Sequence, residues 1–326
     1  MKKLGSLLSR LRSALYVYQR LDEAETNILR ETTIRLSVVE RRLEYMQEAL
    51  GRIEGRQLSG AESAGLSESE FRVFSQWGED GIIQFLLRHV EIERKIFVEF
   101  GADEYNNESN TRFLLTNDNW AGLVIDGGQE HIDRLKQSRA YWLYNLKAVR
   151  AFITRDNINR LLEENGVVGE IGLLSIDIDG NDYWVWKAVE VVSPVVVVVE
   201  YNFRFGSEPA VTIPYDEQFD RARAHPSKIY FGASLKALCL LAASKGYAFV
   251  GCNSNGVNAF FIRRDKLPSS VKFVKEVTPE EGFVAGGFAE VSEVDGEVRK
   301  KSPQEEMQLL RSLNLPLVDV SEDLKG

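Results

Sequence analysis

The chain has 326 residues, 44% of them hydrophobic, which suits one α/β domain of roughly 200–250 residues with added segments and argues against wholesale disorder. The net charge of −9 disfavours nucleic acid as the main partner, because proteins that bind polyanions are usually basic. Two cysteines, Cys239 and Cys252, without a C-x-x-C pair and with three histidines in the chain, argue against a zinc site and favour reduced thiols in a cytoplasmic protein.

The first segment, residues 1–58, places apolar side chains at alternating spacings of three and four residues. Without a proline, this spacing predicts a coiled coil, interrupted only by Asp22 and Glu25. The alternative is a single amphipathic helix packed on its own domain. The repeated positions are Leu4, Leu8, Leu11, Leu15, Tyr18, Leu29, Thr32, Leu36, Val39, Leu43, Met46, Leu50 and Ile53. We expect this helix to form a homo-oligomer. The mixed residues at its repeated positions do not specify a dimer, trimer or tetramer.

The first twenty residues are basic, which allows peripheral contact with anionic lipid at the inner face of a membrane. Solvated charges on the flank of a coiled coil are the alternative. Because Arg10 and Arg12 interrupt the apolar residues, we expect no secretory signal, and no apolar run approaches the length of a membrane span. A Gly-, Ser- and Ala-rich linker, residues 59–70, then marks a domain boundary.

Residues 71–265 alternate between predicted strands and helices. Continuous Val, Ile and Leu runs indicate strands buried on both faces, so we predict a doubly wound, Rossmann-like, mostly parallel sheet. The expected helices are 80–89, 110–115, 129–139, 158–164, 183–189 and 233–245, and the expected strands are 95–100, 121–125, 141–148, 171–177, 195–200, 247–252 and 259–263. The last two strands form a terminal antiparallel hairpin. Residues 266–326 are predicted to be an appendage with a short hairpin and a helix at 303–313.

Two predicted strand ends carry residues suited to a nucleoside. Glu99 and Gly101 end the first strand, and a glycine there lets the backbone approach a ligand closely. The next helix begins near Asn110 and Thr111, whose amide groups can bind a carboxylate or phosphate. Asp126 ends the second strand and can accept both hydrogen bonds of a ribose diol. The alternative for Asp126 is an acid that favours a helix dipole.

A third group of polar residues follows two further strands, whose ends should be neighbours. Asp177 and Asp179 follow one strand, while Glu200 and Asn202 follow the next. Such an all-oxygen set suits Mg²⁺ or Mn²⁺ rather than zinc. The alternative is helix capping by Asp179 or Asp182.

Several short motifs occur in a specific order between residues 71 and 265. They are 74–81 (FSQWGEDG), 99–102 (EFGA), 110–111 (NT), 122–126 (GLVID), 175–183 (SIDIDGNDY), 230–235 (YFGASL) and 258–261 (NAFF). Together they resemble the FkbM-like branch of the class I methyltransferases. The resemblance implies transfer of a methyl group from S-adenosylmethionine to a hydroxyl, often on a sugar or glycan.

The resemblance also implies roles for individual residues. Glu99 and Gly101 would border the methionine part of the cofactor, with the helix start at Asn110 and Thr111 beside it, and Asp126 would hold the ribose. Ser75, Gln76 and Glu79 would lie over the cofactor. Asp177 would face the reacting methyl group. The acids at 177, 179 and 200 are similar to those of magnesium-dependent macrolide-sugar O-methyltransferases, in which metal-bound carboxylates position a sugar diol.

The expected chemistry is attack by a sugar hydroxyl on a sulfonium methyl, which requires alignment and acceptance of one proton. A divalent ion would lower the pKa of the hydroxyl; without one, His225 and Asp179 are candidate bases, although a loop histidine can simply be solvated. Tyr215 and Asp216 either line the acceptor pocket or form a turn. Two other hypotheses are another nucleotide-dependent α/β enzyme, disfavoured by the single glycine after the first strand, and a non-catalytic coiled-coil scaffold.

Overall fold

The computed structural model describes residues 2–58, 65–101, 105, 108–267, 274–287, 291–294 and 297–322, without the side chains of residues 2–11, 13, 14 and 291–300. Two compact units are present, Met1–Leu50 and Gly51–Gly326. The predicted linker at 59–70 lies partly outside the described residues, which resume before a short helix, η1 (Ser67–Ser69). Within the described part of the chain, no helix combines the length and apolar character needed to cross a membrane.

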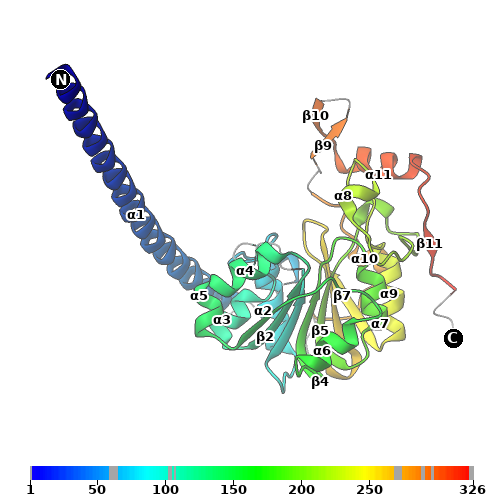
Figure 1. The fold of residues 1–326 in the computed structure, drawn as a ribbon. Helices are drawn as coiled ribbons and strands as arrows, with labels where there is room; N and C mark the ends of the chain where they lie inside the picture. Colours follow the sequence, from blue (N-terminus) through cyan, green and yellow to red (C-terminus); the bar gives the residue numbers. More distant parts are fainter. Residues whose placement is uncertain are drawn as a thin grey trace. The chain divides into compact units, whose positions relative to one another are not determined.

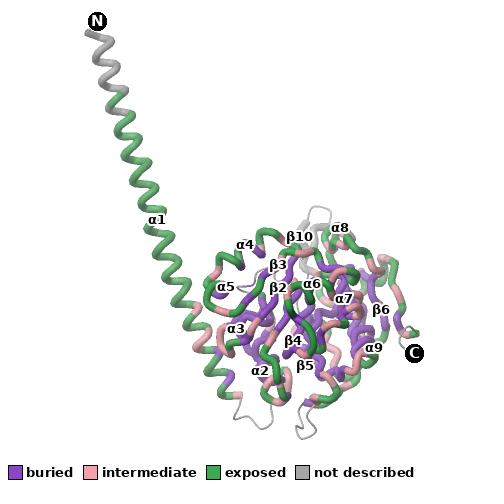
Figure 2. The backbone as a smooth tube through the Cα atoms, turned by 60° about the horizontal axis from the view of Figure 1, so that its bottom comes forward, coloured by how far each residue is buried: buried purple, intermediate pink, exposed green. Residues whose placement is uncertain are grey.

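The N-terminal segment forms one continuous helix, α1 (Lys2–Leu58), which confirms the predicted helix. Its repeated apolar positions from Leu15 to Ile53 are exposed, as Figure 2 shows by the green colour along the helix. Stable isolated helices in water usually depend on packing of an apolar face rather than on helix propensity alone. The association expected from the spacing stays a prediction.

The second unit is built on a seven-stranded sheet in the order β3-β2-β1-β4-β5-β8-β7 (Figure 1). The first five strands pair in parallel, and β8 pairs antiparallel with both of its neighbours. The strands are β1 (Ile96–Phe100), β2 (Ala121–Asp126), β3 (Leu146–Arg150), β4 (Gly169–Ile176), β5 (Val192–Glu200), β7 (Tyr247–Cys252) and β8 (Asn258–Arg263). This confirms the predicted doubly wound, mostly parallel sheet with a terminal antiparallel hairpin. The strand order reverses between β1 and β4, where ligands bind in such sheets.

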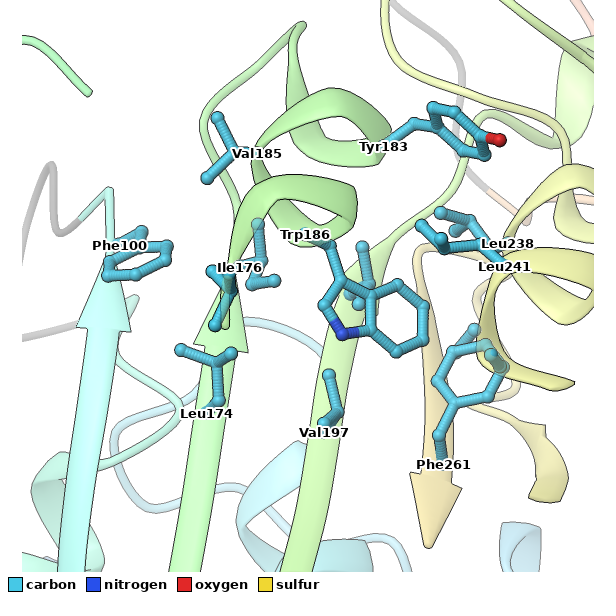
Figure 3. Close-up of a cluster of buried hydrophobic side chains, with 14 of the residues drawn as sticks. Phe100, Leu174, Ile176, Tyr183, Val185, Trp186, Val197, Leu238, Leu241 and Phe261 are labelled. Atoms are coloured by element: carbon cyan, nitrogen blue, oxygen red, sulfur yellow. The ribbon is translucent and has the colours of Figure 1, made fainter. Parts of the chain in front are cut away.

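Helices cover both faces of the sheet. One apolar cluster joins it to α2 (Glu79–His89), α3 (Arg112–Asp118) and α4 (Gln129–Gln137). The other joins it to α6 (Ile158–Glu164), α7 (Asp182–Ala188) and α9 (Leu235–Ser244). Figure 3 shows this second cluster, where Trp186 of α7 lies over Val197 of β5 and beside Phe261 of β8. Both faces of the central strands are therefore buried, as their Val-rich sequences predict.

The predicted strand at 141–148 is wrong in its first half. Residues Arg139–Leu143 form a short helix, α5, and β3 begins only at Leu146. The Ser138 hydroxyl accepts a hydrogen bond from the Tyr141 amide, which caps a helical turn at this point. The aromatic residues 141, 142 and 144 favour a strand by propensity, but this local cap and the exposure of Trp142 and Leu143 favour the helical turn.

The C-terminal segment packs into the same unit as the sheet. The predicted hairpin and helix are present as β9 (Val291–Val294), β10 (Glu297–Lys300) and α11 (Pro303–Ser312). A last strand, β11 (Val318–Asp319), pairs with β6 (Val211–Thr212). Glu306 of α11 and Arg204 of η2 (Phe203–Phe205), just after β5, form a buried ion pair of 2.6 Å. The remaining short elements are α8 (Arg221–Ala224), η3 (Arg264–Lys266) and α10 (Pro279–Gly282).

Candidate functional site

A cavity of about 600 Å³ opens at the carboxyl ends of β1, β2, β4 and β5. Gly101, Asp126, Asp177 and Glu200, each at one of these strand ends, line it together. Because parallel strands bring their carboxyl ends to one edge, residues far apart in the chain meet here. The volume is typical of a small-molecule site.

The lining of this cavity is strongly acidic. Its lining includes six acidic side chains, but one arginine, Arg221, and one histidine, His131. The six are Glu79, Glu108, Asp126, Asp177, Asp179 and Glu200. Clefts lined by one sign of charge concentrate ligands of the opposite sign. The cavity therefore suits a cationic ligand and opposes one that carries phosphates.

Position 101 requires a glycine because the chain after β1 passes very close to the chain after β4. Its φ is +71°, and an added Cβ would lie 1.7 Å from the carbonyl oxygen of Asp177. The Asp177 amide donates to the Phe100 carbonyl at 3.2 Å, which fixes this approach. The glycine thus lets β1 place Asp177 at the cavity, in addition to lining the cavity itself.

Glu99 lies behind the cavity and does not line it. It accepts hydrogen bonds from the Ser109 and Thr111 hydroxyls and from the Asn110 amide, at 2.6–2.7 Å. Burial raises its pKa to about 7, against the opposing effect of these donors. Thr111 is fully buried with it, whereas Asn110 lines the cavity and donates to the Ser175 hydroxyl. Glu99 therefore shapes the loop that presents Asn110.

The 74–81 motif forms a tightly bonded loop, residues 74–78, and the first turn of α2. Asp80 Oδ2 accepts hydrogen bonds from the amides of residues 73, 74 and 75, and the Ser75 hydroxyl accepts one from the Asp80 amide. Ser75 is buried outside the cavity, while Gln76 and Glu79 line it. Burial raises the pKa of both Glu79 and Asp80. Side-chain amides of Asn253 and Asn258 fix Glu79 from the terminal hairpin.

Asp126 ends β2 at one end of the cavity. Its Oδ1 accepts the Gly128 amide at 2.6 Å and lies 3.1 Å from Nδ1 of His131. These contacts hold the carboxylate at the cavity wall. Beside it, Ala151 and Phe152, the residues after β3, supply an apolar surface. This end of the cavity combines a carboxylate with an apolar surface.

Asp177, Asp179 and Glu200 meet at the other end. Each offers a carboxylate oxygen, and the three oxygens lie within 4.8 Å of one another. Burial, followed by the neighbouring carboxylates, raises the pKa of Asp177 and Glu200 well above the ordinary range. Glu200 Oε2 is buried, and no donor among the described residues reaches it. Crowded carboxylates of this kind suit a shared proton or an added cation.

Arg221 gives Asp179 a cationic partner. One guanidinium nitrogen lies 2.6 Å from Asp179 Oδ1, and Nε donates to the Lys228 carbonyl. The guanidinium also stacks 3.8 Å from the centre of the Phe231 ring. Asp182, considered above as a cap, accepts the amides of residues 178 and 180 and so shapes the turn that carries Asp179, at φ +55°.

Two predicted residues have other roles. Asn202 is fully buried outside the cavity: its amide nitrogen donates to the carbonyls of Ile229 and Phe231, and its oxygen accepts the Arg204 amide. These hydrogen bonds occupy the side-chain amide of Asn202 and hold the loop after β5. Asn202 is therefore not positioned to bind a metal ion. His225 ends α8, and its Nδ1 contacts the Ser227 hydroxyl and amide. His225 lines neither this cavity nor the groove beside it.

That groove, of about 730 Å³, adjoins the Asp179 end of the cavity. The two share Phe152, Ile178, Asp179, Phe219 and Arg221 as lining residues. The groove continues along residues 218–223 to Lys228. Tyr215 and Asp216, predicted at the acceptor pocket, do not line it. The site is thus a cavity with an adjoining, more open extension.

Sequence reasoning missed several lining residues, chiefly His131, Asn181, Phe219, Arg221 and Asn258. Arg221 meets Asp179 across 42 positions, and Asn258 meets Glu79 across 179, so no local pattern links either pair. A signal existed for Asn181 and Asn258, which belong to the motifs 175–183 and 258–261. Ala102 and residues 103 and 104, after β1, lie outside the described residues.

No protein-family model matches the sequence, and no curated protein matches it. Solved structures with a similar fold include PKMT2 from Rickettsia typhi, with 9% identity, a TM-score of 0.40, and coverage of 62% of this chain and 56% of that one. A SAM-dependent methyltransferase from Aquifex aeolicus shows 9% identity and a TM-score of 0.33, covering 56% and 89%.

The O-methyltransferase TomG from Streptomyces achromogenes, solved with SAM, shows 13% identity and a TM-score of 0.35, covering 66% and 87%. The chain spans little more than half of the length of PKMT2.

Proposed function

We propose that this protein is an S-adenosylmethionine-dependent O-methyltransferase that acts on a sugar hydroxyl of a polysaccharide or glycolipid precursor. The observation that carries the proposal is the acidic cavity at the switch point of the sheet. S-adenosylmethionine is a nucleoside with a positive sulfonium and an ammonium group, so the acidic lining of the cavity favours it. The same carboxylates oppose the pyrophosphate of a dinucleotide, which disfavours an oxidoreductase.

The lining residues fit the cofactor along its length. Asp126 would bind the ribose diol, and Ala151 and Phe152 would contact the adenine. At the far end, Asn258 and Asn181 each have a buried side-chain oxygen for which no donor exists among the described residues. Such oxygens cost free energy unless a ligand supplies hydrogen-bond donors, as an ammonium group does.

The bound cofactor would supply a methyl group on an electron-poor sulfur. The protein must then orient the acceptor hydroxyl and take up its proton. Asp177 lines the cavity beside Asp179 and Glu200, and its ionised carboxylate would accept that proton when no metal is bound. Asp177 and Glu200 would also hold Mg²⁺ or Mn²⁺, because carboxylate oxygens are the ligands these ions prefer. The adjoining groove, with Phe219 and polar residues, gives a sugar both a ring face and hydrogen-bond partners.

Calorimetric titration with S-adenosylmethionine and, separately, with NAD⁺ tests the proposal. We expect micromolar binding of S-adenosylmethionine and none of NAD⁺. Asp126→Ala should weaken binding about tenfold, the equivalent of roughly 1.4 kcal/mol. Asp133→Ala is the matched control, since Asp133 is an exposed acid on α4 that bonds to Gln129 and does not line the cavity. Absence of binding at millimolar S-adenosylmethionine would leave the scaffold hypothesis, and binding of NAD⁺ would favour a dinucleotide enzyme.

A further inference from the structure

We infer that α1 binds a second copy of this chain through its repeated apolar positions, while a different face of its last turns packs on its own domain. The apolar positions from Leu15 to Ile53, spaced by three and four, are called the seam. The inference is independent of the catalytic proposal.

The face that packs on the domain contains two glycines and a leucine. Gly51 and Gly55 are buried, and Leu58 packs against the cluster of Phe71, Val73, Phe74 and Phe113. A Cβ on Gly51 would lie 2.3 Å from a Val73 methyl group, and one on Gly55 would lie 3.2 Å from the Arg88 guanidinium. Spacings of four and three place these positions on one side of the helix. The two glycines therefore allow the close approach.

The seam lies on another side of the same turns. Leu50 is 59% exposed and Ile53 is 49% exposed, although Gly51 between them is buried. Successive residues of a helix differ by about 100° in direction, so positions 50 and 53 cannot share the face of 51, 55 and 58. The domain thus leaves the seam position Ile53 uncovered. In these turns, the apolar residues of the seam therefore do not serve to pack the helix on its own domain.

The period and the bordering charges identify the partner as another such helix. The spacing averages 3.5 residues from Leu4 to Ile53 without a change of phase. A straight helix drifts by about 20° per heptad from this repeat, so it matches only a supercoiled partner helix. Both signs of charge border the seam, with Arg35 and Arg42 on one side and Glu40 on the other. Identical helices can pair opposite charges, whereas an anionic membrane would repel the glutamate.

Two carboxylates interrupt the seam and provide a second test. Asp22 and Glu25 occupy successive seam positions, where a partner helix would remove them from water. Burying charges in this way weakens association, and polar seam residues commonly trade stability for register. Association should therefore strengthen when both become leucine.

Sedimentation equilibrium of the full chain, whose monomer mass is 36.9 kDa, tests the inference. We expect oligomers at low micromolar concentration. Leu36→Asp with Leu43→Asp should raise the dissociation constant at least about a hundredfold. The control, Asn27→Asp with Ser37→Asp, adds the same two charges off the seam and should leave assembly unchanged. All five tryptophans follow residue 70, so their fluorescence shows that the domain stays folded.

Asp22→Leu with Glu25→Leu should lower the dissociation constant at least about tenfold. The inference is overturned if the native chain is monomeric at about 100 µM, even if it then binds another protein or vesicles of phosphatidylglycerol. It is also overturned if the aspartate substitutions on the seam and those of the control weaken assembly equally. The same holds if Asp22→Leu with Glu25→Leu does not strengthen assembly. S-adenosylmethionine binding should be the same in all these variants, so its loss would bear on the catalytic proposal alone.

Discussion

Two sets of buried acids in this domain differ in how their oxygens are used. Glu99 accepts three hydrogen bonds, and Glu306 is paired with Arg204. Glu200 is also buried, yet its Oε2 receives no hydrogen bond from the described residues, and Asp177 beside it adds a second carboxylate. Bonded acids stabilise loops, whereas an acid left with an unused oxygen costs stability and is available for a ligand. Hydrogen-bond partners therefore distinguish Glu99 and Glu306, which support loops, from Glu200, which lines the cavity.

The largest effect should come from the Arg204–Glu306 pair, in which both side chains are at most 2% exposed. Glu306→Ala leaves the guanidinium buried without its carboxylate and should lower the free energy of unfolding by about 3–5 kcal/mol. Urea denaturation followed by tryptophan fluorescence measures this loss. Arg204→Met with Glu306→Leu should restore most of it; equal losses in the single and double variants would show that the charge is not the cause.

Glu99 should make stability depend on pH. The unfolded carboxyl ionises near 4.5, but the folded one ionises only at about 7. Between these values the folded state holds the extra proton, so stability falls as pH rises from 4.5 to 7, by roughly 3 kcal/mol for this group. Asp182, with a pKa raised to about 6, acts in the same direction.

Glu99→Gln removes the Glu99 part of this dependence. Urea midpoints measured from pH 4.5 to 7.5 should therefore decline less steeply in Glu99→Gln than in the native protein. Identical slopes would show that Glu99 ionises normally in its loop.

Glu200→Gln should affect stability and cation binding in opposite directions. Since Glu200 is a buried acid with an unused oxygen and a raised pKa, its replacement should increase stability at neutral pH while it weakens cation binding. We expect a loss of Mn²⁺ affinity of at least about tenfold, measured by calorimetry. Glu217→Gln, an exposed position outside both cavities, is the control. Unchanged Mn²⁺ affinity in Glu200→Gln would remove Glu200 from any metal site.

Much of the fold and part of the candidate site could be predicted from patterns within single segments of the sequence. The Val-rich run at 195–199 predicts a central strand because both of its faces must be buried. The acids at 126, 177 and 200 could be assigned to one edge, since parallel strands end together. Local propensity failed at residues 141–143, where the Ser138 cap forms a helical turn in place of a strand.

By itself, the sequence determined the period of α1, the order of strands and helices, and the edge at which the acids gather, because each depends on spacing along a single segment. Only the tertiary structure decided which acids face the cavity. Glu99 lies near the end of β1 and Asn202 just after β5, close in the chain to the lining residues Gly101 and Glu200, but hydrogen bonds with other loops make both side chains supports. Hydrogen-bond partners separated by tens or hundreds of residues leave no periodic signal in the sequence, and it is those partners that distinguish a supporting residue from a candidate binding residue.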